Sequence, residues 1–303
     1  MLEDQSNVKA WFYLLPALIL LGIFIFFPIF NAFFLVFVDE YNYMQGTYEG
    51  FTLINNFRYV VTDHNFRVAM TNTMLLTFVS VPVSVIIALL ISVWLNAIKR
   101  LQGFFQTIFF LPYVTNAIAI GMAFAFMFHV RFGLINWFLG IFGISPINWV
   151  NTGASWGTAI FALLVYVTWL GLAFKIMVFL SGLQGIDKQY YDAARVDSAS
   201  RSRVFRRITV PLLSPMIMYI TVTSFIGAFK AYTEVIGMFG ERLGPPGNDR
   251  AVITVVALVY RSLDRSGVPG ALSEAAAASL ILFGVTLVFT MVNMQVSKKR
   301  VHY

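Results

Sequence analysis

The run WFYLLPALILLGIFIFFPIFNAFFLVFV, from Trp11 to Val38, contains no charged residue, and Asn31 is nearly its only polar interruption. It exceeds the roughly 20 apolar residues that an α-helix needs to cross a bilayer. It is also much longer than the apolar core of a signal peptide, and no small-residue cleavage motif follows it. Pro16 and Pro28 are tolerated in such a helix when neighbouring helices satisfy the carbonyls that proline leaves free. The run is therefore predicted to be a retained membrane span.

Working outward from this run, five further apolar stretches of similar length predict membrane spans. Hydrophobic residues make up 59% of the chain and charged residues 12%, whereas soluble domains carry about a quarter charged residues. We expect an all-α integral membrane protein with six transmembrane helices in a single domain over residues 1–303. The predicted spans are 11–38, 71–97, 104–130, 156–183, 212–239 and 271–296. Two apolar runs, 137–144 and 251–260, are too short to span.

The distribution of Lys and Arg predicts the orientation of the spans. Cytoplasmic loops carry an excess of these residues. With the N-terminus inside, the inner segments hold most of them, including Lys188, Arg206 and Arg207, and acidic residues such as Asp39 and Asp63 fall outside. Both termini are therefore predicted to be cytoplasmic, in a multi-pass protein of a cell membrane surrounded by lipid.

Several classes of function are disfavoured by the composition. The net charge of +7 is not gathered in a basic run with interleaved aromatics, so no nucleic-acid partner is expected. The chain has no cysteine, which excludes disulfides and thiolate metal sites, and its three histidines do not suggest another metal site. It also lacks a phosphate-binding Gly-x-x-x-x-Gly-Lys-Ser/Thr motif, so we expect no ATP hydrolysis and no cofactor in this chain.

The polar, basic loop at residues 184–211, between the fourth and fifth predicted spans, is the most informative segment for function. Asp187 is a plausible N-cap for a short helix through Val196. A second short helix is expected over 200–208, before Pro211 and Pro215 end it and begin the fifth span. Two short helices joined by a turn would form a compact knob, and its alanines would let another protein approach the backbone closely.

This 184–211 loop resembles the signature of permease subunits of binding-protein-dependent ABC importers, in the carbohydrate-uptake group that includes maltose, multiple-sugar and glycerol-phosphate permeases. That signature reads Glu-Ala-Ala, two residues, Asp-Gly-Ala, then Phe, Ile, Leu-Pro and a second Pro. The matching positions here are Asp192-Ala193-Ala194, Asp197-Ser198-Ala199, Phe205, Ile208, Pro211 and Pro215. Weaker matches, such as Gly133–Asn136 and Gly244-Pro245, extend the resemblance over nearly the whole chain.

The resemblance implies a set of partners and a coupling role for the loop. In the family, this loop docks in a groove on a cytoplasmic ATPase subunit. The implied coupling residues are Asp192, Ala193, Ala194, Asp197, Ser198, Ala199, Phe205 and Pro211. The implied partners are a second permease, two ATPase subunits that bind ATP and Mg²⁺, and an extracellular solute-binding protein, in a bacterial inner or plasma membrane.

The chain departs from the signature at two positions of this loop. Asp192 replaces Glu, which keeps the charge but shortens its reach. Ser198 replaces Gly, which costs roughly 1–2 kcal/mol if the turn needs left-handed geometry.

Polar residues within predicted spans are costly and usually face the interior of a helix bundle, so they are candidates for a substrate path. Aromatic faces suit stacking against sugar rings. The candidate substrate-path residues are Asn72, Asn116, Trp169, Phe174, Ser224, Lys230 and Tyr232. Lys175 and Glu234 are further intramembrane charges, and the spacing of Lys230 and Glu234 predicts an ion pair on one helix face.

Three other functions compete with the importer permease. A stand-alone secondary transporter or channel for a small polar solute would be favoured by intramembrane carboxylates or inverted repeats, and only Glu234 fits that description. A membrane enzyme would need a catalytic set inside the bilayer, and His129 has no obvious nucleophilic partner. A passive scaffold would not explain the two-helix pattern of the loop.

Overall fold

The computed structural model describes residues 7–98 and 100–298, which are mostly helical. The chain divides into two compact units. The first unit contains residues up to 63 together with 259–281, and the second contains 64–258 with the residues from 282 onward. The single domain over 1–303 stays a prediction.

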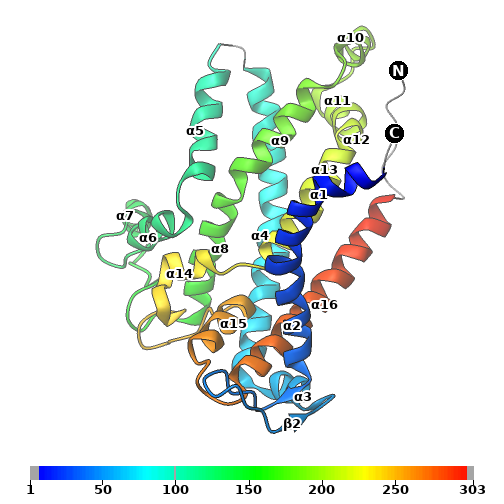
Figure 1. The fold of residues 1–303 in the computed structure, drawn as a ribbon. Helices are drawn as coiled ribbons and strands as arrows, with labels where there is room; N and C mark the ends of the chain where they lie inside the picture. Colours follow the sequence, from blue (N-terminus) through cyan, green and yellow to red (C-terminus); the bar gives the residue numbers. More distant parts are fainter. Residues whose placement is uncertain (1–6, 99, 299–303) are drawn as a thin grey trace. The chain divides into compact units, whose positions relative to one another are not determined.

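The first unit begins with a long apolar helix, drawn in blue in Figure 1. One turn of this helix is a wider, π-helical turn. Its parts are α1 (Asn7–Leu21), the π-helical turn η1 (Gly22–Phe26) and α2 (Phe27–Val36). Its Phe, Leu and Ile side chains are mostly exposed in this chain, so they require lipid or an apolar partner. The helix agrees with the first predicted span but ends at Val36, because Val38 already belongs to a strand.

A short hairpin and a helix follow this span. They are β1 (Val38–Asp39), β2 (Gly50–Phe51), which pairs antiparallel with β1, and α3 (Asn55–Thr62). The buried amide of Asn56 donates to the carbonyls of Val36, at 2.8 Å, and Val38, at 2.9 Å. Since the last carbonyls of a helix lack partners within the helix, Asn56 helps to end α2 cleanly.

The second unit is a bundle of helices of very different lengths. Its elements up to the 184–211 loop are α4 (His64–Ala97), α5 (Gln102–Val114), α6 (Ala117–Met127), α7 (Leu134–Ile141), α8 (Trp156–Leu170) and α9 (Leu172–Gln184). The later elements are α10 (Lys188–Val196), α11 (Arg201–Val204), η2 (Phe205–Thr209), α12 (Val210–Leu212), α13 (Ser214–Ala228), α14 (Thr233–Phe239) and η3 (Gly240–Arg242). Two helices, α15 (Val255–Asp264) and α16 (Ala271–Lys298), have residues in both units.

The core of the second unit lies where α4 packs against α9 and α13. Ala88 and Leu95 of α4 are fully buried against Ile176 and Phe179 of α9. The hydroxyl of Ser92 donates to the carbonyl of Ile176 at 3.0 Å, which adds a polar link between the two helices. Small residues at this contact let the backbones approach closely, as is common between membrane helices.

Four helical stretches are long and apolar enough to cross a membrane: Lys9–Val36, His64–Ala97, Trp156–Gln184 and Ala271–Gln295. They coincide with the first, second, fourth and sixth predicted spans, although α4 begins at His64 rather than 71. Two further candidates are bent helix pairs, so the described residues contain four spans, or up to six if each bent pair counts as one. The six-span count and the orientation stay predictions.

The third predicted span, 104–130, is wrong as a single helix. Helices α5 and α6 meet at a bend of 102°. Thr115 is extended, and the side chain of Asn116 accepts hydrogen bonds from the backbone N–H groups of Ile118 at 2.8 Å and Ala119 at 3.3 Å. Asn116 is therefore an N-cap that starts a new helix.

The fifth predicted span, 212–239, is also divided. Helix α13 ends at Ala228, the residues from Phe229 to Tyr232 are not helical, and α14 is a separate helix that begins at Thr233. The hydroxyl of Thr254 donates to the carbonyl of Ala231 at 2.6 Å, so the interruption keeps a partner for its backbone.

Candidate functional site

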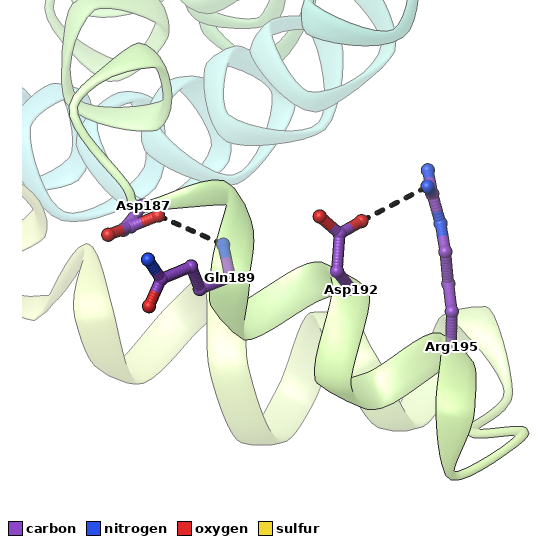
Figure 2. Close-up of polar contacts among 4 residues, drawn as sticks. All are labelled: Asp187, Gln189, Asp192 and Arg195. Atoms are coloured by element: carbon purple, nitrogen blue, oxygen red, sulfur yellow. Dashed lines mark hydrogen bonds and ion pairs between the residues drawn. The ribbon is translucent and has the colours of Figure 1, made fainter.

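The first helix of the 184–211 loop begins at a side-chain cap, as predicted. The carboxylate of Asp187 accepts a hydrogen bond from the backbone N–H of Gln189 at 2.9 Å, and α10 runs from Lys188 to Val196 (Figure 2). Asp192 and Arg195 form an exposed ion pair at 3.2 Å on this helix (Figure 2). Exposed pairs contribute little to stability, so the Asp192 carboxylate is held only loosely.

The turn after α10 has left-handed geometry at Ser198, where the family signature has glycine. Ser198 has φ of +53°. The N–H of Ala199 donates to the carbonyl of Ala194 at 2.9 Å, and the N–H of Ser198 donates to that of Arg195 at 3.0 Å. These two bonds define a Schellman turn, which fixes the direction in which the chain leaves the helix.

The second helix of the loop is longer than the predicted 200–208, and Pro211 does not end it. Ser200 caps it by accepting from the N–H of Arg203 at 3.4 Å, and helical geometry continues through α11, η2 and α12 to Leu212. At the end of the π-turn, the N–H of Val210 reaches the carbonyl of Phe205. A proline ring clashes with the carbonyl four residues earlier in an α-helix, and the wider turn just before Pro211 relieves that crowding.

The two helical segments of the loop, α10 and α11–α12, are its two arms. They contact each other and enclose a groove, which we call the loop groove. The hydroxyls of Tyr191 and Thr209 lie 3.3 Å apart across the arms. The groove has a volume of about 500 Å³. Its lining residues come from both arms: Asp187, Gln189, Tyr190, Ala193, Ala194, Asp197, Ala199, Arg203, Val204, Arg207 and Ile208.

The predicted coupling residues differ in exposure and in whether they line the loop groove. Ala193, Ala194, Asp197 and Ala199 line the loop groove, and Ala194 is buried. Asp192, Ser198 and Pro211 are exposed, and Phe205 is half-buried in the π-turn. The structure thus brings together the alanines and Asp197, with Asp192 on the outer side.

A second cavity, which we call the Lys175 cavity, lies inside the helix bundle of the second unit. Its volume is about 350 Å³, within the range of about 300–1,000 Å³ typical of small-molecule sites. Its lining residues belong to α4, the α5–α6 break, the α8–α9 junction, α13 and the start of α14: Ser80, Val81, Ser84, Pro112, Tyr113, Thr115, Ala117, Val167, Leu170, Gly171, Phe174, Lys175, Ser224, Gly227, Ala228, Ala231 and Glu234.

The charged groups of this cavity are Lys175 and Glu234. Lys175 is 7% exposed, and its ammonium donates to the carbonyl of Gly171 at 2.9 Å. The carboxylate of Glu234 accepts from the N–H of Tyr232 at 3.2 Å and from the hydroxyl of Thr233 at 3.3 Å. Elsewhere the lining offers the hydroxyls of Ser80, Ser84, Thr115 and Ser224. Such a lining suits a ligand with several hydroxyl groups.

An aromatic pair forms another part of the cavity wall. The rings of Tyr113 and Phe174 stack with centroids 5.6 Å apart and an interplanar angle of 21°. Both residues line the cavity. Flat aromatic surface beside hydroxyl groups is the combination expected for binding a sugar ring.

The structure brings only two of the seven predicted substrate-path residues, Phe174 and Ser224, into the Lys175 cavity. Asn72 is buried elsewhere, where its amide donates to the carbonyls of Ala251 and Ile253, each at 2.9 Å, and accepts from Trp156 Nε1 at 2.9 Å. Asn72 therefore links α4 to the 251–253 segment and to Trp156 at the start of α8.

Asn116, Trp169 and Tyr232 also lie outside the lining of the Lys175 cavity. Asn116 caps α6, and Trp169 packs against Phe124 with ring centroids 5.2 Å apart. Tyr232 precedes α14 and is half-buried. A role for these three in the path stays a prediction.

The predicted ion pair between Lys230 and Glu234 is wrong. Lys230 is exposed in the turn between α13 and α14, while Glu234 lies in α14. The four-residue spacing would pair them only on a continuous helix. Among the residues that the structure describes, no ion pair joins them.

Sequence reasoning did not find the contributions of Ser80, Ser84, Tyr113 and Thr115 to the cavity. Thr115 was hidden because 104–130 was taken as one helix. The available signal was an N-cap residue, Asn116, after Pro112 and before an apolar run.

The described residues also contain no group of three or more His, Asp or Glu placed to hold a metal ion.

Comparison with known proteins gives consistent findings. The family model "Binding-protein-dependent transport system inner membrane component" matches residues 69–301. The trehalose/maltose transport system permease protein MalF of Thermococcus litoralis is 28% identical over 299 residues, covering 99% of this chain and 97% of that protein. The lactose transport system permease protein LacF of Rhizobium radiobacter is 29% identical over 302 residues, covering 99% and 97% respectively.

A solved structure shares the fold of this chain. It is that of a bacterial alginate ABC transporter in complex with an alginate pentasaccharide-bound periplasmic protein, and the similar chain in it gives a TM-score of 0.76. Its sequence is 21% identical, and the match covers 97% of this chain and 95% of that chain. At this identity the likeness speaks for the fold alone.

Proposed function

Because this chain belongs to the family of binding-protein-dependent transport system inner membrane components, we propose that it is a permease subunit of an ATP-driven importer. In this proposal it forms half of a transmembrane pathway for a sugar or sugar-like solute. A second permease completes the pathway, two ATPase subunits bind ATP and Mg²⁺, and an extracellular binding protein delivers the solute. The protein crosses the inner membrane several times, with the basic 184–211 loop and both termini in the cytoplasm.

The observation that carries this proposal is the covalent continuity between the loop and the Lys175 cavity. Helix α9 contributes Phe174 and Lys175 to the cavity and ends at Gln184, where the loop begins. Helix α13 contributes Ser224 and begins at Ser214, just after the loop. At 1.5 Å per residue, about 14–15 Å of helix separates the loop from the cavity on both sides. A displacement of the loop would therefore reach the cavity through two short helices.

The proposed docking of the loop on an ATPase follows from its shape and capping. Asp187, the turn at Ser198 and the cap at Ser200 each fix a helix end with hydrogen bonds. A segment held in this way transmits a push with less loss than an unstructured linker. The alanines of the loop groove leave room for a partner's side chain close to the backbone.

The proposed substrate class rests on the curated relatives and on the cavity lining. The relatives named above are permeases for trehalose/maltose and lactose. The stacked rings of Tyr113 and Phe174, together with the hydroxyls of Ser80, Ser84 and Ser224, offer the apolar surface and hydrogen-bonding groups that a saccharide needs.

The coupling role is tested by reversing charge in the loop groove. In proteoliposomes that contain the full complex, Asp197→Arg places a long cation among small groove residues. We expect solute uptake and solute-stimulated ATPase activity to fall at least about tenfold, a loss of about 1.4 kcal/mol, while the complex still assembles. Glu241→Arg makes the same charge change at an exposed acid of η3, outside the loop, and is the matched control. Normal uptake and normal ATPase stimulation in Asp197→Arg would refute the coupling role.

The alternative function, a stand-alone transporter, has one observation in its favour. Glu234 is an acidic residue on the wall of a membrane cavity, as is common in ion-coupled transporters. The two functions differ in their energy source. Solute accumulation by this chain alone, driven by an ion gradient without ATPase subunits, would favour the alternative.

A further inference from the structure

The ammonium of Lys175 is buried in the second unit without an ion-pair partner among the described residues. Lys175 is more than nine-tenths buried and lines the cavity. An ammonium has three donor hydrogens, and the carbonyl of Gly171 accepts one of them at 2.9 Å. Within residues 7–98 and 100–298, no carboxylate forms an ion pair with it. A buried charge without a counter-charge is costly, so its position calls for an explanation.

The backbone around Lys175 is shaped to admit this ammonium. A Cβ atom placed on Gly171 would lie 2.8 Å from Lys175 Nζ. Glycine at the α8–α9 junction therefore leaves the space that the lysine head group occupies. The Gly171 carbonyl anchors the ammonium on one side, and the cavity lies on another side.

Among the described residues, Glu234 forms no ion pair with this cation. Its carboxylate is bonded to the N–H of Tyr232 and the hydroxyl of Thr233, both from its own segment. It is also half-buried rather than buried. The acid of the cavity is thus solvated by its neighbours, while the cation retains unpaired donors. Lys175 is therefore the group of this cavity that can pair with an anionic ligand.

We propose that the Lys175 cavity binds a saccharide that carries an oxyanion, either a uronate carboxylate or a phosphate ester, and that Lys175 pairs with that group. The inference rests on the importer function proposed above and names the substrate class of the same cavity. Tyr113 and Phe174 offer the surface for the ring, and the cavity hydroxyls serve its neutral groups. Lys175 is then the residue that determines the charge of the solute.

The test measures binding to the assembled complex directly, without the binding protein, so that the delivery step does not impose its own selectivity. Equilibrium dialysis in nanodiscs of zwitterionic lipid compares three radiolabelled probes: trigalacturonate, glucose 1-phosphate and the neutral galactotriose. The trisaccharides differ in charge but share their ring size. The two anions distinguish a carboxylate from a phosphate as the preferred group.

In the wild-type complex we expect at least one anionic probe to bind at least tenfold more tightly than galactotriose. Lys175→Met keeps the length of the side chain and removes its charge. It should raise the Kd of that anion about 10- to 100-fold, because a buried charge-assisted hydrogen bond is lost, and should leave the Kd of galactotriose within about twofold. Lys175→Arg should retain the preference for the anion. Lys188→Met removes an exposed lysine of α10 that does not line the cavity, and it should also retain the preference.

Three results would overturn the proposal. They are a galactotriose Kd equal to or lower than both anion values, an anion Kd unchanged by Lys175→Met, and no anion binding to the wild-type complex at 10 mM probe, roughly the weak limit for a specific site. These results are separable from failure of the proposed function. A complex that shows one of these three results and still couples ATP hydrolysis to solute uptake would remove the charge inference and leave the importer assignment standing.

Discussion

Replacing Gly121 by alanine perturbs a close contact between helices α6 and α14. Gly121 of α6 faces Gly237 of α14, and both glycines lie where the two helices cross. A Cβ atom on Gly121 would lie 2.6 Å from the carbonyl carbon of Gly237 and 2.7 Å from its Cα. Both of these atoms belong to backbone, so no side chain can rotate away to relieve the clash.

The size of the effect follows from these distances. Ordinary contacts of a Cβ atom begin near 3.4 Å, so the helices must separate locally by about 0.8 Å. Overpacking of this kind costs about 1–3 kcal/mol. For a chain of this size, each kcal/mol lowers Tm by about 2–4 °C. We therefore expect Gly121→Ala to lower Tm by about 2–12 °C.

The same change should also affect the cavity. Helix α6 contributes Ala117 to the lining and α14 contributes Glu234, so separating the helices moves one wall of the cavity. A shift of this size at a binding site weakens ligand binding, and we expect solute-stimulated ATPase activity to need a higher solute concentration.

The assay is thermal unfolding of the purified complex in nanodiscs, followed by intrinsic fluorescence, with ATPase titrations on the same samples. Gly284→Ala is the control, because Gly284 lies within helix α16 and a Cβ atom there would meet no atom within 4 Å. Alanine at that position should raise Tm slightly or leave it unchanged. A Gly121→Ala variant with the Tm and the solute dependence of the wild type would contradict this reasoning. It would show that the close crossing of α6 and α14 does not position the cavity wall formed by Ala117 and Glu234.

Three further changes test other parts of the structure. Ser198→Gly should increase the free energy of unfolding by up to about 1 kcal/mol and so raise the Tm of the complex, because φ of +53° is strained for serine; a lower Tm would contradict the left-handed turn. Asn72→Leu should cost at least about 2 kcal/mol and reduce the yield of folded protein in size-exclusion chromatography, because it leaves Trp156 Nε1 and two carbonyls without their partner; a normal yield and Tm would contradict this role. Asp192→Asn should leave Tm unchanged, since its ion pair with Arg195 is exposed; a large drop in Tm would show that the pair stabilises α10.

The sequence predicted the 184–211 loop well because its signals are local. Asp187 caps α10, and the turn at Ser198, whose geometry the sequence left open, is left-handed. Both features depend on a few adjacent residues, whose preferences for caps and turns are strong. The end of the second helix was mispredicted. Pro211 is tolerated because a π-turn precedes it, and no residue type in the sequence indicates a π-turn.

The long apolar helices α4 and α16 were also predictable, because a run of apolar residues of this length has few other stable conformations in lipid. Their exact beginnings were not. Helix α4 starts at His64, seven residues before the apolar run at 71, because polar residues extend a helix that tertiary contacts already stabilise.

Polar residues within the predicted spans say less about which side chains line the Lys175 cavity. Asn72 and Asn116 lie outside its lining and satisfy backbone groups, and their role in a substrate path stays a prediction. Asn72 bonds the 251–253 segment, and Asn116 caps α6. A sequence without tertiary contacts cannot separate a side chain that binds backbone from one that binds solute, since both are polar residues within an apolar run.

The two mispredicted spans and the Lys175 cavity are aspects of one arrangement. Irregular backbone at membrane depth is tolerated only where protein buries it or where it lines a polar cavity, because lipid offers no hydrogen bonds. The break between α5 and α6 places Thr115 and Ala117 on the cavity, and the break between α13 and α14 places Ala231 and Glu234 there. An unbroken pair of spans would have had no free backbone at this depth and no reason to keep a polar cavity. The interruptions that hydropathy misses therefore mark the polar cavity in which we propose that the solute binds.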